Sequence, residues 1–571
     1  MLDTATAQPT THPLLETHRA TLEEAAQALR KRSYYSRYPE SPSPRVYGEN
    51  APQDGQAAHE TTLNKDYTAL QDQPGTGESV GDEKSPYGPT LGVRYPQLAV
   101  DAAMEAALAA MPAWRDAGAE VRAAVCVEII DRINQRSHEM AHAVMHTSGQ
   151  PFVMSFQAGG PHAQDRALEA VVAALEEQRR IPSSVTWEKP AKGEPIRMQK
   201  DYRLVPRGVA LVICSNTFPT WNAYPGIFAS LATGNPVVVK PHPRAILPLA
   251  LTVQIARETL AEAGFGQALV QLAPEGDGGT LAKDLALHPA VRIIDYTGGP
   301  GFGNWLETEA GAQGKLVYTE KAGLNTVVVD STDDLQGMLG NLAFSFSLYS
   351  GQMCTAPQNV YVPANGVDTD QGHLSAEEFT ARLGEAISRF NADDARAVEI
   401  LGATVNDEVR ARASDVPALA QSLGGAVALD SRPVIHPSYP DAVIRTPALI
   451  SVDADNLGAY TQECFGPVAF VITTEGTADS LQRFAGTVRE HGGMTAAVYS
   501  TDEETLDQAR EAAADAGVAL SENLTGQVFV NQTAAFSDLH GTGANPAANA
   551  AYSDAAFVAN RFRVITSRRH V

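Results

Sequence analysis

The chain has 571 residues, of which 44% are hydrophobic, so it is long enough to bury two or three separate cores. It carries 43 basic and 67 acidic residues, a formal net charge of −24, which argues against nucleic acid and anionic membrane surfaces as main partners. No apolar run approaches the roughly 20 residues of a membrane span. An anionic ligand would have to be held by locally placed amides and lysines.

The four cysteines are Cys126, Cys214, Cys354 and Cys464, and they form neither a CxxC motif nor a zinc-binding spacing. The sequence therefore predicts no metal site. The first residues, MLDTATAQPTTHPLLE, contain an acidic residue and polar threonines where a secretory signal needs a basic stretch and an apolar core. We expect free thiols in a reducing cytoplasm.

The first 180 residues combine helices with one irregular segment. Residues 12–32 place leucines and alanines at helical spacing and predict an amphipathic helix. Residues 33–96 are rich in Pro, Gly, Tyr and Ser and predict an extended arm or linker. From about 98 to 180, Ala-rich segments with acidic faces predict helices, which we interpret as solvated surface helices without chemistry.

From residue 203 short apolar strands alternate with helices, notably a helix over 245–264. The first strands are expected at 209–213, 236–240, 268–272 and 292–296. This order predicts a parallel sheet buried on both faces, whose ligands bind outside the carboxyl ends of the strands. A second set, which predicts another lobe, is expected near 325–330, 357–362, 466–473 and 494–499.

Two residues with reactive side chains stand in distinctive settings. Glu320 ends the stretch LVYTE, and Cys354 follows Ser-Gly-Gln-Met. Upstream lie a strand ending in Lys240 and a Gly-rich turn over 297–303, and downstream comes ECFGPV over 463–468. A thiol nucleophile, a carboxylate base and a strand-plus-glycine mononucleotide site together suit oxidation of an aldehyde through a covalent thioester.

The order of these motifs over residues 200–535 resembles the aldehyde dehydrogenase superfamily: ATGN with VVVK, a TG turn, the Glu, GQ-x-C, E-x-F-G-P-V and V-F-V-N. The resemblance implies an α/β fold with two Rossmann-like parallel-sheet lobes and a small strand oligomerisation arm. It implies a coenzyme-binding domain at 1–186 and 206–320, a catalytic domain at 321–547, and an arm at 187–205 and 548–571. Such arms imply a homodimer or a dimer of dimers.

Two further stretches, YSRYPESPSPRVYGE and GTGANPAANAAYSDAAFVANRFR, look like the phenylacetic-acid-degradation N-protein branch of that superfamily. If this narrower resemblance holds, the substrate is a coenzyme-A-linked semialdehyde formed by ring opening in phenylacetate catabolism.

A lone cysteine is more often a small buried hydrophobe than a nucleophile. At Cys354, however, Gly351 and Gln352 predict a tight turn that presents the sulfur while the cysteine's own amide faces a nascent oxyanion. The resemblance assigns Cys354 as nucleophile and Glu320 as the base that activates the thiol or the deacylating water. Coenzyme-A-acylating relatives generally lack this base, so Glu320 favours release of a free acid.

The resemblance also implies how a nicotinamide coenzyme is held. Lys240 is similar to the lysine that touches the adenosine ribose or its phosphate. Pro243 stands where NAD-preferring relatives often hold a ribose-binding glutamate. With Lys240 and His242 nearby, this absence favours NADP over NAD.

The turn and the later motif complete the expected coenzyme site. Gly298 and Gly299 let a helix N-terminus approach the pyrophosphate, and Gly299 replaces the serine that many relatives carry. Glu463 and Phe465 match the residues that hold the nicotinamide ribose and ring.

One motif departs from the superfamily, which usually offers the asparagine of N-F-P as an oxyanion donor. Here the triplet is Thr217-Phe218-Pro219, with Asn216 one place earlier. The oxyanion donor is then one of three groups: Asn216 after a local shift, the Thr217 hydroxyl, or the Cys354 amide alone. We favour Asn216. The expected substrate pocket consists of Phe218, Trp221, Asn222, Phe346, Met353 and Phe536.

The sequence thus predicts NAD(P)-dependent oxidation of a small-molecule aldehyde to the carboxylic acid. Two other classes stay open. A coenzyme-A-acylating dehydrogenase is disfavoured by Glu320. A non-catalytic assembly protein with this fold is disfavoured by Cys354 and Glu320, although the altered N-F-P triplet keeps it open.

Overall fold

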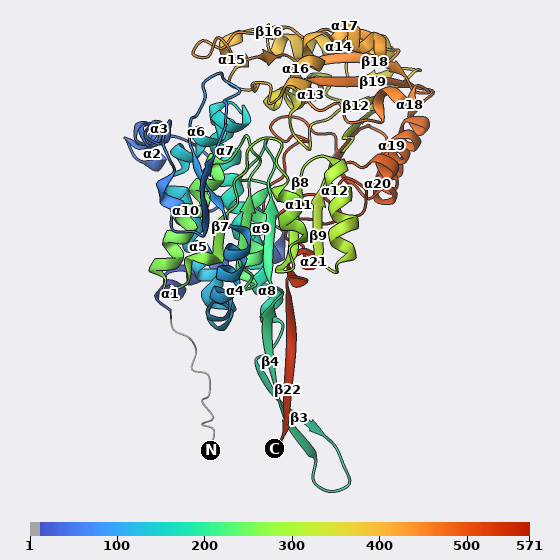
Figure 1. The fold of residues 1–571 in the computed structure, drawn as a ribbon. Coiled ribbons are helices and arrows are strands. Elements are labelled where there is room, and N and C mark those ends of the chain that lie inside the picture. The colour runs from blue at the N-terminus through green and yellow to red at the C-terminus, as the bar shows by residue number, and fades with distance from the viewer. Residues whose placement is uncertain (1–11, 322) are drawn as a thin grey trace.

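The computed structural model describes residues 12–321 and 323–571 and contains two large parallel-stranded sheets covered by helices, with a three-stranded arm projecting from them (Figure 1). Residues 1–11, on which part of the expectation about a signal sequence rests, lie outside the described residues. None of the helices in the described part is long and apolar enough to cross a membrane.

The first sheet has five parallel strands in the order β7-β6-β5-β8-β9. Their bounds are β5 Val209–Ile213, β6 Val237–Lys240, β7 Val270–Leu272, β8 Val291–Thr297 and β9 Leu316–Glu320. Ile213 pairs with both Lys240 and Tyr296, so the three central strands end level. The side chains that follow these strands therefore emerge at one edge of the sheet, as the sequence predicts.

The second sheet has seven strands in the order β15-β18-β19-β12-β10-β20-β21, and only its edge strand β15 is antiparallel. Their bounds are β10 Thr326–Val329, β12 Asn359–Pro363, β15 Ala426–Leu429, β18 Ala448–Asp453, β19 Val468–Thr474, β20 Thr495–Tyr499 and β21 Ala519–Glu522. All four strands predicted for the second lobe are present. The smaller sheets use β1 Gly75–Val80, β2 Tyr95–Leu98, β11 Ser331–Thr332, β13 Val367–Thr369, β14 Gly372–Leu374, β16 Pro433–Val434 and β17 Ile444–Arg445.

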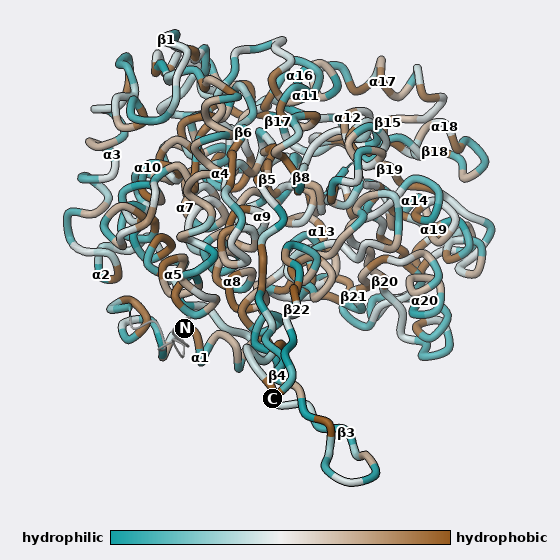
Figure 2. The backbone as a smooth tube through the Cα atoms, turned by 60° about the horizontal axis from the view of Figure 1, so that its bottom comes forward, coloured by the Kyte–Doolittle hydropathy of each residue, from teal (hydrophilic) through white to brown (hydrophobic). Residues whose placement is uncertain are grey.

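The arm is an antiparallel sheet of β3 Ser184–Lys189, β4 Ile196–Pro206 and β22 Phe562–His570. Strand β22 runs along β4 from the Phe562–Pro206 pair to the His570–Met198 pair. In Figure 2 these strands leave the body of the molecule and are mostly hydrophilic. Some apolar side chains on them are nevertheless exposed, Ile565 to 57%.

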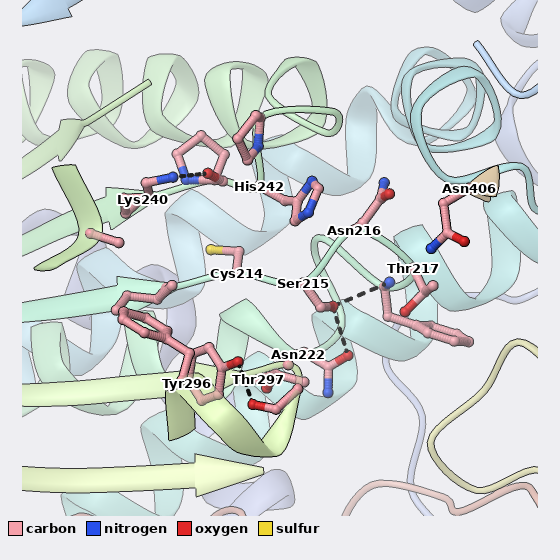
Figure 3. A pocket seen from close by; sticks show the side chains of 18 of the residues that line it. Cys214, Ser215, Asn216, Thr217, Asn222, Lys240, His242, Tyr296, Thr297 and Asn406 are labelled. Carbon is pink, nitrogen blue, oxygen red and sulfur yellow. Dashed lines mark hydrogen bonds between the residues drawn. The ribbon is translucent and has the colours of Figure 1, made fainter. Parts of the chain in front are cut away.

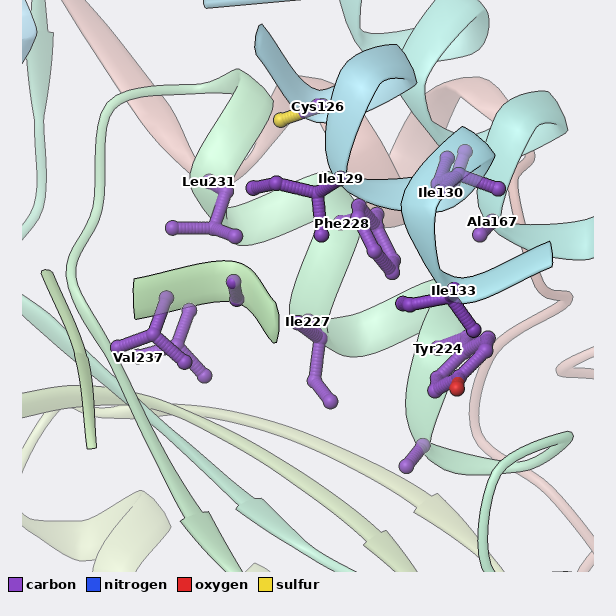
Figure 4. Close-up of a cluster of buried hydrophobic side chains, with 14 of the residues drawn as sticks. Cys126, Ile129, Ile130, Ile133, Ala167, Tyr224, Ile227, Phe228, Leu231 and Val237 are labelled. Atoms are coloured by element: carbon purple, nitrogen blue, oxygen red, sulfur yellow. The ribbon is translucent and has the colours of Figure 1, made fainter. Parts of the chain in front are cut away.

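The helices of the first half pack a large core beside the five-stranded sheet. The helices up to residue 310 are α1 Pro13–Lys31, α2 Pro44–Tyr47, α3 Ala51–Thr62, α4 Val100–Asp116, α5 Ala119–Gln135, α6 Ser137–Ser148, α7 Phe152–Gln157, α8 Ala163–Arg179, α9 Ala223–Ala232, α10 Leu247–Glu262, α11 Leu281–Leu287 and α12 Pro300–Trp305. Figure 4 shows Ile129 and Ile133 of α5 facing Phe228 of α9 across this core. The remaining helices are α13 Leu335–Ser347, α14 Ala376–Phe390, α15 Asp394–Ala397, α16 Asp407–Ser414, α17 Val416–Ser422, α18 Leu457–Tyr460, α19 Thr477–His491, α20 Glu503–Ala516 and α21 Ala555–Ala559.

The interpretation of residues 98–180 as solvated surface helices is wrong for α8. Almost every side chain of this helix is buried, including Arg166 and Glu169. Its alanines are small enough to let α5 and α9 approach closely. The charged residues that suggest a wet face are instead paired with each other inside the molecule.

Residues 33–96 also differ from the expected extended arm. They contain α2, α3, β1 and β2, and they bury the rings of Tyr38, Tyr67, Tyr87 and Tyr95. The Tyr95 hydroxyl donates to Glu83, whose carboxylate accepts the backbone N–H groups that open α10. The segment lacks periodicity because scattered tyrosines, rather than a repeating apolar face, attach it to the body.

Candidate active site

A cleft of about 710 Å³ begins at the carboxyl edge of the five-stranded sheet and ends at Cys354. Its lining comes from both halves of the chain, since it includes Lys240 and Glu320 as well as Cys354 and Glu463. Figure 3 shows the sheet side, where Cys214, Lys240 and Tyr296 lie at the ends of neighbouring strands.

Lys240 lies buried at one end of this cleft. Its Nζ is 2.8 Å from Glu275 Oε2 and donates a hydrogen bond of 3.2 Å to the Pro241 carbonyl. His242 and Pro243 line the same end, but burial, together with Lys240 and Arg244, lowers the pKa of His242 to about 4. His242 is therefore neutral at neutral pH, and Glu275 compensates the charge of Lys240.

Glu275 was missed by the sequence reasoning. It follows β7 by three residues and so falls at the same carboxyl edge as Lys240, which is the signal that could have identified it.

Gly298 and Gly299 line the cleft where β8 turns into α12. A Cβ on Gly298 would lie 2.4 Å from the Tyr296 hydroxyl, so any other residue there would force that ring to shift. Gly299 has open space around it, and its carbonyl accepts a 2.8 Å hydrogen bond from the Tyr296 hydroxyl. This open space explains why serine is compatible with the same position in relatives.

Glu463 and Phe465 line the cleft from the side of the second sheet. The Phe465 carbonyl accepts a 2.8 Å hydrogen bond from Arg412. Burial raises the pKa of Glu463 to about 7, although the Gly323 N–H and Arg412 oppose that shift. A buried lysine, a carboxylate, a glycine turn and an aromatic ring along one cleft form a donor and acceptor set that fits a nicotinamide dinucleotide.

Cys354 stands at the other end of the cleft, after a tight turn. Tyr349 and Ser350 both have φ of 52°, and Gly351 has φ of 65°. A Cβ on Gly351 would lie 2.5 Å from the Gly466 carbonyl oxygen, so the turn needs glycine there. The Cys354 carbonyl is fixed by a 2.8 Å hydrogen bond from Asn325.

Glu320 ends β9 and is only 2% exposed. Its Oε2 accepts a 3.1 Å hydrogen bond from Asn222, whose own oxygen accepts from Ser215. Asn222 therefore lies in the cleft, as expected, and it orients the carboxylate of Glu320.

His540 completes this cluster and was missed by the sequence reasoning. Its Nε2 lies 3.8 Å from Cys354 Sγ and 3.2 Å from Glu320 Oε1. One atom of each of these three side chains lies within 4.8 Å of the other two. The histidine stands in no motif and comes from a loop near the C-terminus, so only the fold reveals it.

In this cluster the pKa of the Cys354 thiol and the pKa of the Glu320 carboxylate shift in opposite directions. Burial, the charge of Glu320 and the nearby Glu463 raise the pKa of the Cys354 thiol well above its ordinary value. Burial alone would raise the pKa of Glu320, but its interactions with His540 and Cys354 hold that pKa below its ordinary value. At neutral pH the carboxylate is therefore ionised while the resting thiol keeps its proton.

The loop that carries His540 is held by the buried helix α8. Arg166 donates to the Asp538 carbonyl at 2.9 Å and to the Thr533 hydroxyl at 3.0 Å. Glu169 accepts the Phe536 N–H at 3.0 Å, and Phe536 has a φ of 68°. These charged contacts fix a backbone conformation that is unfavourable for a phenylalanine.

Two residues of the expected substrate pocket are in hydrophobic cores instead. Phe346 is buried on the seven-stranded sheet, since it lies on the inner face of α13. Phe536 is fully buried and packs edge-on against Tyr35, 5.1 Å between ring centroids. Neither aromatic ring reaches the cleft, so both expectations are corrected.

The other expected pocket residues lie near Cys354. Phe218 lines the cleft and joins an apolar cluster with Met154, Leu348 and Tyr349, against which Met353 packs. Trp221 also packs there, and its ring edge meets the His540 ring at 4.5 Å.

Asn216 and Thr217 lie on the loop after β5 and both line the cleft (Figure 3). The Asn216 amide donates one N–H to the Thr147 carbonyl at 2.9 Å, and the Thr217 carbonyl accepts from Gln150 at 2.7 Å. The loop is therefore anchored on α6 and the residues after it.

Comparison with known proteins gives one consistent result. The model of the aldehyde dehydrogenase family matches residues 94–541. A solved structure titled as an NAD-dependent aldehyde dehydrogenase from Burkholderia multivorans is 53% identical, with a TM-score of 0.95 over 98% of this chain and 99% of that chain. Vanillin dehydrogenase of Pseudomonas fluorescens is 26% identical, covering 70% of this chain and 77% of its own length.

Two further matches agree. N-succinylglutamate 5-semialdehyde dehydrogenase of Chromobacterium violaceum is 27% identical over 72% of this chain and 78% of its own length. A 1-pyrroline-5-carboxylate dehydrogenase structure, 21% identical, shares the fold with a TM-score of 0.74 over 94% of this chain and 99% of that chain. Because the family match covers most of the chain, including Glu320 and Cys354, the chain belongs to the aldehyde dehydrogenase family and is an oxidoreductase that acts on aldehydes.

Proposed function

We propose that the protein oxidises an aldehyde to a carboxylic acid through a thioester on Cys354, with Glu320 as the base that activates the deacylating water. The observation that carries this proposal is the position of Cys354 and Glu320 together at one end of a cleft whose other end holds Lys240. The sulfur adds to the carbonyl carbon, and the ionised carboxylate takes a proton from water to cleave the thioester.

The coenzyme of this reaction is NAD, which would be held by Lys240, the turn at Gly298 and Gly299, Glu463 and Phe465. When bound, it supplies the acceptor for the hydride that leaves the aldehyde carbon. The similarity to an NAD-dependent enzyme at 53% identity supports this coenzyme.

The preference for NADP inferred from Pro243 finds no support in the charges of the site. Glu275 pairs with Lys240 at 2.8 Å, and the imidazole of His242 is neutral. Beside Lys240 and His242, a 2′-phosphate would meet the Glu275 carboxylate and a neutral imidazole. We therefore place NAD ahead of NADP, with Glu275 in the discriminating role that Pro243 leaves empty.

The product is a free acid rather than an acyl-coenzyme A. The Glu320 carboxylate is buried, ionised and oriented by Asn222, which suits activation of water. The same intact cluster disfavours a purely non-catalytic assembly role. A requirement for coenzyme A as the acyl acceptor in steady-state turnover would instead establish the acylating alternative.

For the substrate we retain the coenzyme-A-linked semialdehyde of phenylacetate catabolism that the resemblance of the two terminal stretches implies. The apolar cluster of Met154, Phe218, Leu348 and Tyr349 beside Cys354 supports a chain or ring with apolar character next to the aldehyde. One relative is named for vanillin, an aromatic aldehyde, and another for N-succinylglutamate 5-semialdehyde, an aliphatic one.

The oxyanion donor remains assigned to Asn216, which lines the cleft and keeps one amide N–H beyond the one given to Thr147. Asn216→Ala and Thr217→Val distinguish the two candidates. The variant that removes the true donor should lose about 10²–10³ in rate, while the other should stay near wild type.

The division into a coenzyme-binding domain (1–186 and 206–320), a catalytic domain (321–547) and an arm (187–205 and 548–571) also stands as a proposal. Exposed apolar side chains on the arm, such as Ile565, suit pairing with a second copy in a homodimer or a dimer of dimers. The four cysteines are free, which is compatible with the expected cytoplasm.

One experiment tests the function directly. Purified protein is mixed in a stopped-flow instrument with NAD or NADP and a panel of aliphatic, aromatic and coenzyme-A-linked semialdehydes. Formation of reduced coenzyme with release of the free acid supports the proposal. Absence of turnover across the whole panel would contradict it.

A further inference from the structure

His540 lies where neither the sequence motifs nor the family assignment requires a histidine. Its Nε2 is within hydrogen-bonding reach of the sulfur, at 3.8 Å from Cys354 Sγ, and 3.2 Å from Glu320 Oε1. The side chain is buried, with 4% of the residue exposed. A buried imidazole between a thiol and a carboxylate has the order of groups that activates a cysteine nucleophile.

The imidazole is held in this place by its neighbours. The Trp221 ring meets it edge-on at 4.5 Å, and the Tyr552 ring stacks on it at 5.3 Å with an interplanar angle of 27°. The His540 carbonyl accepts the Tyr552 N–H at 3.0 Å. After it, Gly541 turns with φ of 73°, where a Cβ would approach the Ala550 carbonyl oxygen at 3.0 Å. Rotation of the ring away from Cys354 would break its contacts with Trp221 and Tyr552, while the backbone on both sides of it stays fixed.

The thiol needs such a partner. Burial and the carboxylates of Glu320 and Glu463 raise the pKa of Cys354, so the resting sulfur is protonated at neutral pH. Both oxygens of Glu320 already have partners, since Oε2 accepts from Asn222 and Oε1 faces His540. The His540 imidazole, whose Nε2 lies 3.8 Å from the sulfur, is placed to take that proton.

We propose that His540 is the acid–base group of Cys354, whose Nε2 takes the thiol proton as the sulfur attacks and returns it when the thioester is cleaved. In the attack, the S–H bond breaks, the proton goes to Nε2, and the sulfur electron pair forms the S–C bond. The carbonyl π pair moves to oxygen. The imidazolium then faces the ionised Glu320 Oε1, which stabilises it.

The return step balances in the same way. Water adds to the thioester carbon, the carbonyl π pair moves to oxygen and later re-forms the C=O bond, and one water proton goes to Glu320, which releases it to solvent after the acid departs. The S–C bond breaks with its electron pair on sulfur, and the thiolate recovers the proton from Nε2. This assignment rests on the proposed role of Cys354 as nucleophile, and it separates two duties that sequence reasoning gave to Glu320 alone.

The test measures the thiol itself, without coenzyme or aldehyde. Wild type, His540→Gln and His540→Asn are alkylated with iodoacetamide between pH 5.5 and 9.5, and peptide mass spectrometry separates Cys354 from Cys464. Loss of the imidazole should move the inflection of the Cys354 profile to higher pH. The rate at pH 7 should then fall about tenfold or more, which corresponds to at least one unit of thiol pKa.

The control is His138→Gln, which removes another buried imidazole whose partner is the Pro42 carbonyl, outside the cleft. Its alkylation profile should match wild type. NADH binding, read by fluorescence, defines the folded fraction of every variant, and all rates are expressed per folded protein. Two substitutions of different size are used so that misfolding of one leaves the other to decide.

Pre-steady-state kinetics then locate the effect. His540→Gln should slow the burst of reduced coenzyme by about a hundredfold, whereas Glu320→Gln should leave the burst and stop the steady state. An unchanged alkylation profile in a folded His540 variant would overturn the proposal. A normal burst followed by slow deacylation would also overturn the proposal, because His540 would then activate the deacylating water and not the thiol.

Failure of the proposed function looks different. If Cys354→Ala keeps its aldehyde oxidation, Cys354 is not the nucleophile, whatever the alkylation profiles show. If Cys354→Ala is inactive and the His540 variants alkylate as wild type, only the assignment of His540 falls.

Discussion

The coenzyme end of the cleft is assembled from the ends of neighbouring strands, whereas the reacting end draws its groups from β9, the turn before Cys354 and the loop before Gly541. At the coenzyme end, backbone register places Lys240 and Gly298 at the same edge of one sheet. At the reacting end, Cys354 and His540 meet only through tertiary packing, 186 positions apart in the chain. The first kind of site is fixed by the sheet, and the second by buried side-chain contacts.

This difference predicts that substitutions at the reacting end lower the rate of aldehyde oxidation most. Cys354→Ala should reduce aldehyde oxidation by at least about a thousandfold, since loss of a catalytic nucleophile removes the whole covalent route. Coenzyme affinity should stay nearly unchanged, because the thiol takes no part in holding the dinucleotide. Steady-state rates and fluorescence titration with NADH measure the two ends separately, and loss of both together would contradict their independence.

Glu320→Gln should have the next largest effect, a fall in steady-state rate of about 10²–10⁴. The substitution leaves the thiol route to the thioester open but removes the base for water. Rapid mixing should show a burst of reduced coenzyme followed by a stall, and mass spectrometry should show acylated Cys354. Asn222→Ala, which frees the carboxylate from its hydrogen bond, is the milder companion variant.

At the coenzyme end the expected changes are smaller and concern selectivity. Glu275→Gln removes the carboxylate beside Lys240 and should raise kcat/KM for NADP relative to NAD by about tenfold to a hundredfold. A charge-assisted contact of Lys240 with the 2′-phosphate contributes about 1.5–3 kcal/mol. If wild type already prefers NADP, Pro243 rather than Glu275 governs the choice.

The smallest effect concerns stability away from the cleft. His59 of α3 stacks on His146 of α6 at 5.3 Å, and burial lowers the pKa of His59 to about 3 and of His146 to about 4. Both imidazoles are neutral in the folded protein and titrate near 6.5 when unfolded, so the unfolded chain binds more protons below that pH. Stability should be complete above pH 6.5 and decline as the pH falls towards 4.

At pH 5 each imidazole should lower the free energy of unfolding by about 2 kcal/mol relative to pH 7.5. Urea unfolding at both pH values measures this difference. His59→Asn should remove part of the pH dependence, and an unchanged dependence would contradict the role of the stack.

Much of the fold could be predicted from the sequence, because parallel strands buried on both faces leave runs such as VALVI and VVVK that report their own structure. The cleft positions of Cys354, Glu320 and Lys240 could be predicted for the same reason, since each follows a strand or a turn with a local signature. His540 and Glu275 could not be found from a motif, because their importance comes from their partners in space, Cys354 and Lys240.

The errors have a related cause. The charges on α8 predict a wet surface only if they face water, and Arg166 and Glu169 face each other instead. The aromatic rings of Phe346 and Phe536 suit a substrate pocket and a hydrophobic core equally, so only their position in the fold shows which one they occupy.

The hydrogen bonds from Arg166 and Glu169 of α8 to the loop before Gly541 also affect the order of folding. Arg166 and Thr533 are 367 positions apart, so their contact closes one of the longest loops in the chain. Helices and the five-stranded sheet can form before this contact, but the imidazole reaches the sulfur only after it. During refolding, native circular dichroism should therefore return before Cys354 gains its native reactivity. Newly made protein would pass through a stage that is compact yet cannot turn over.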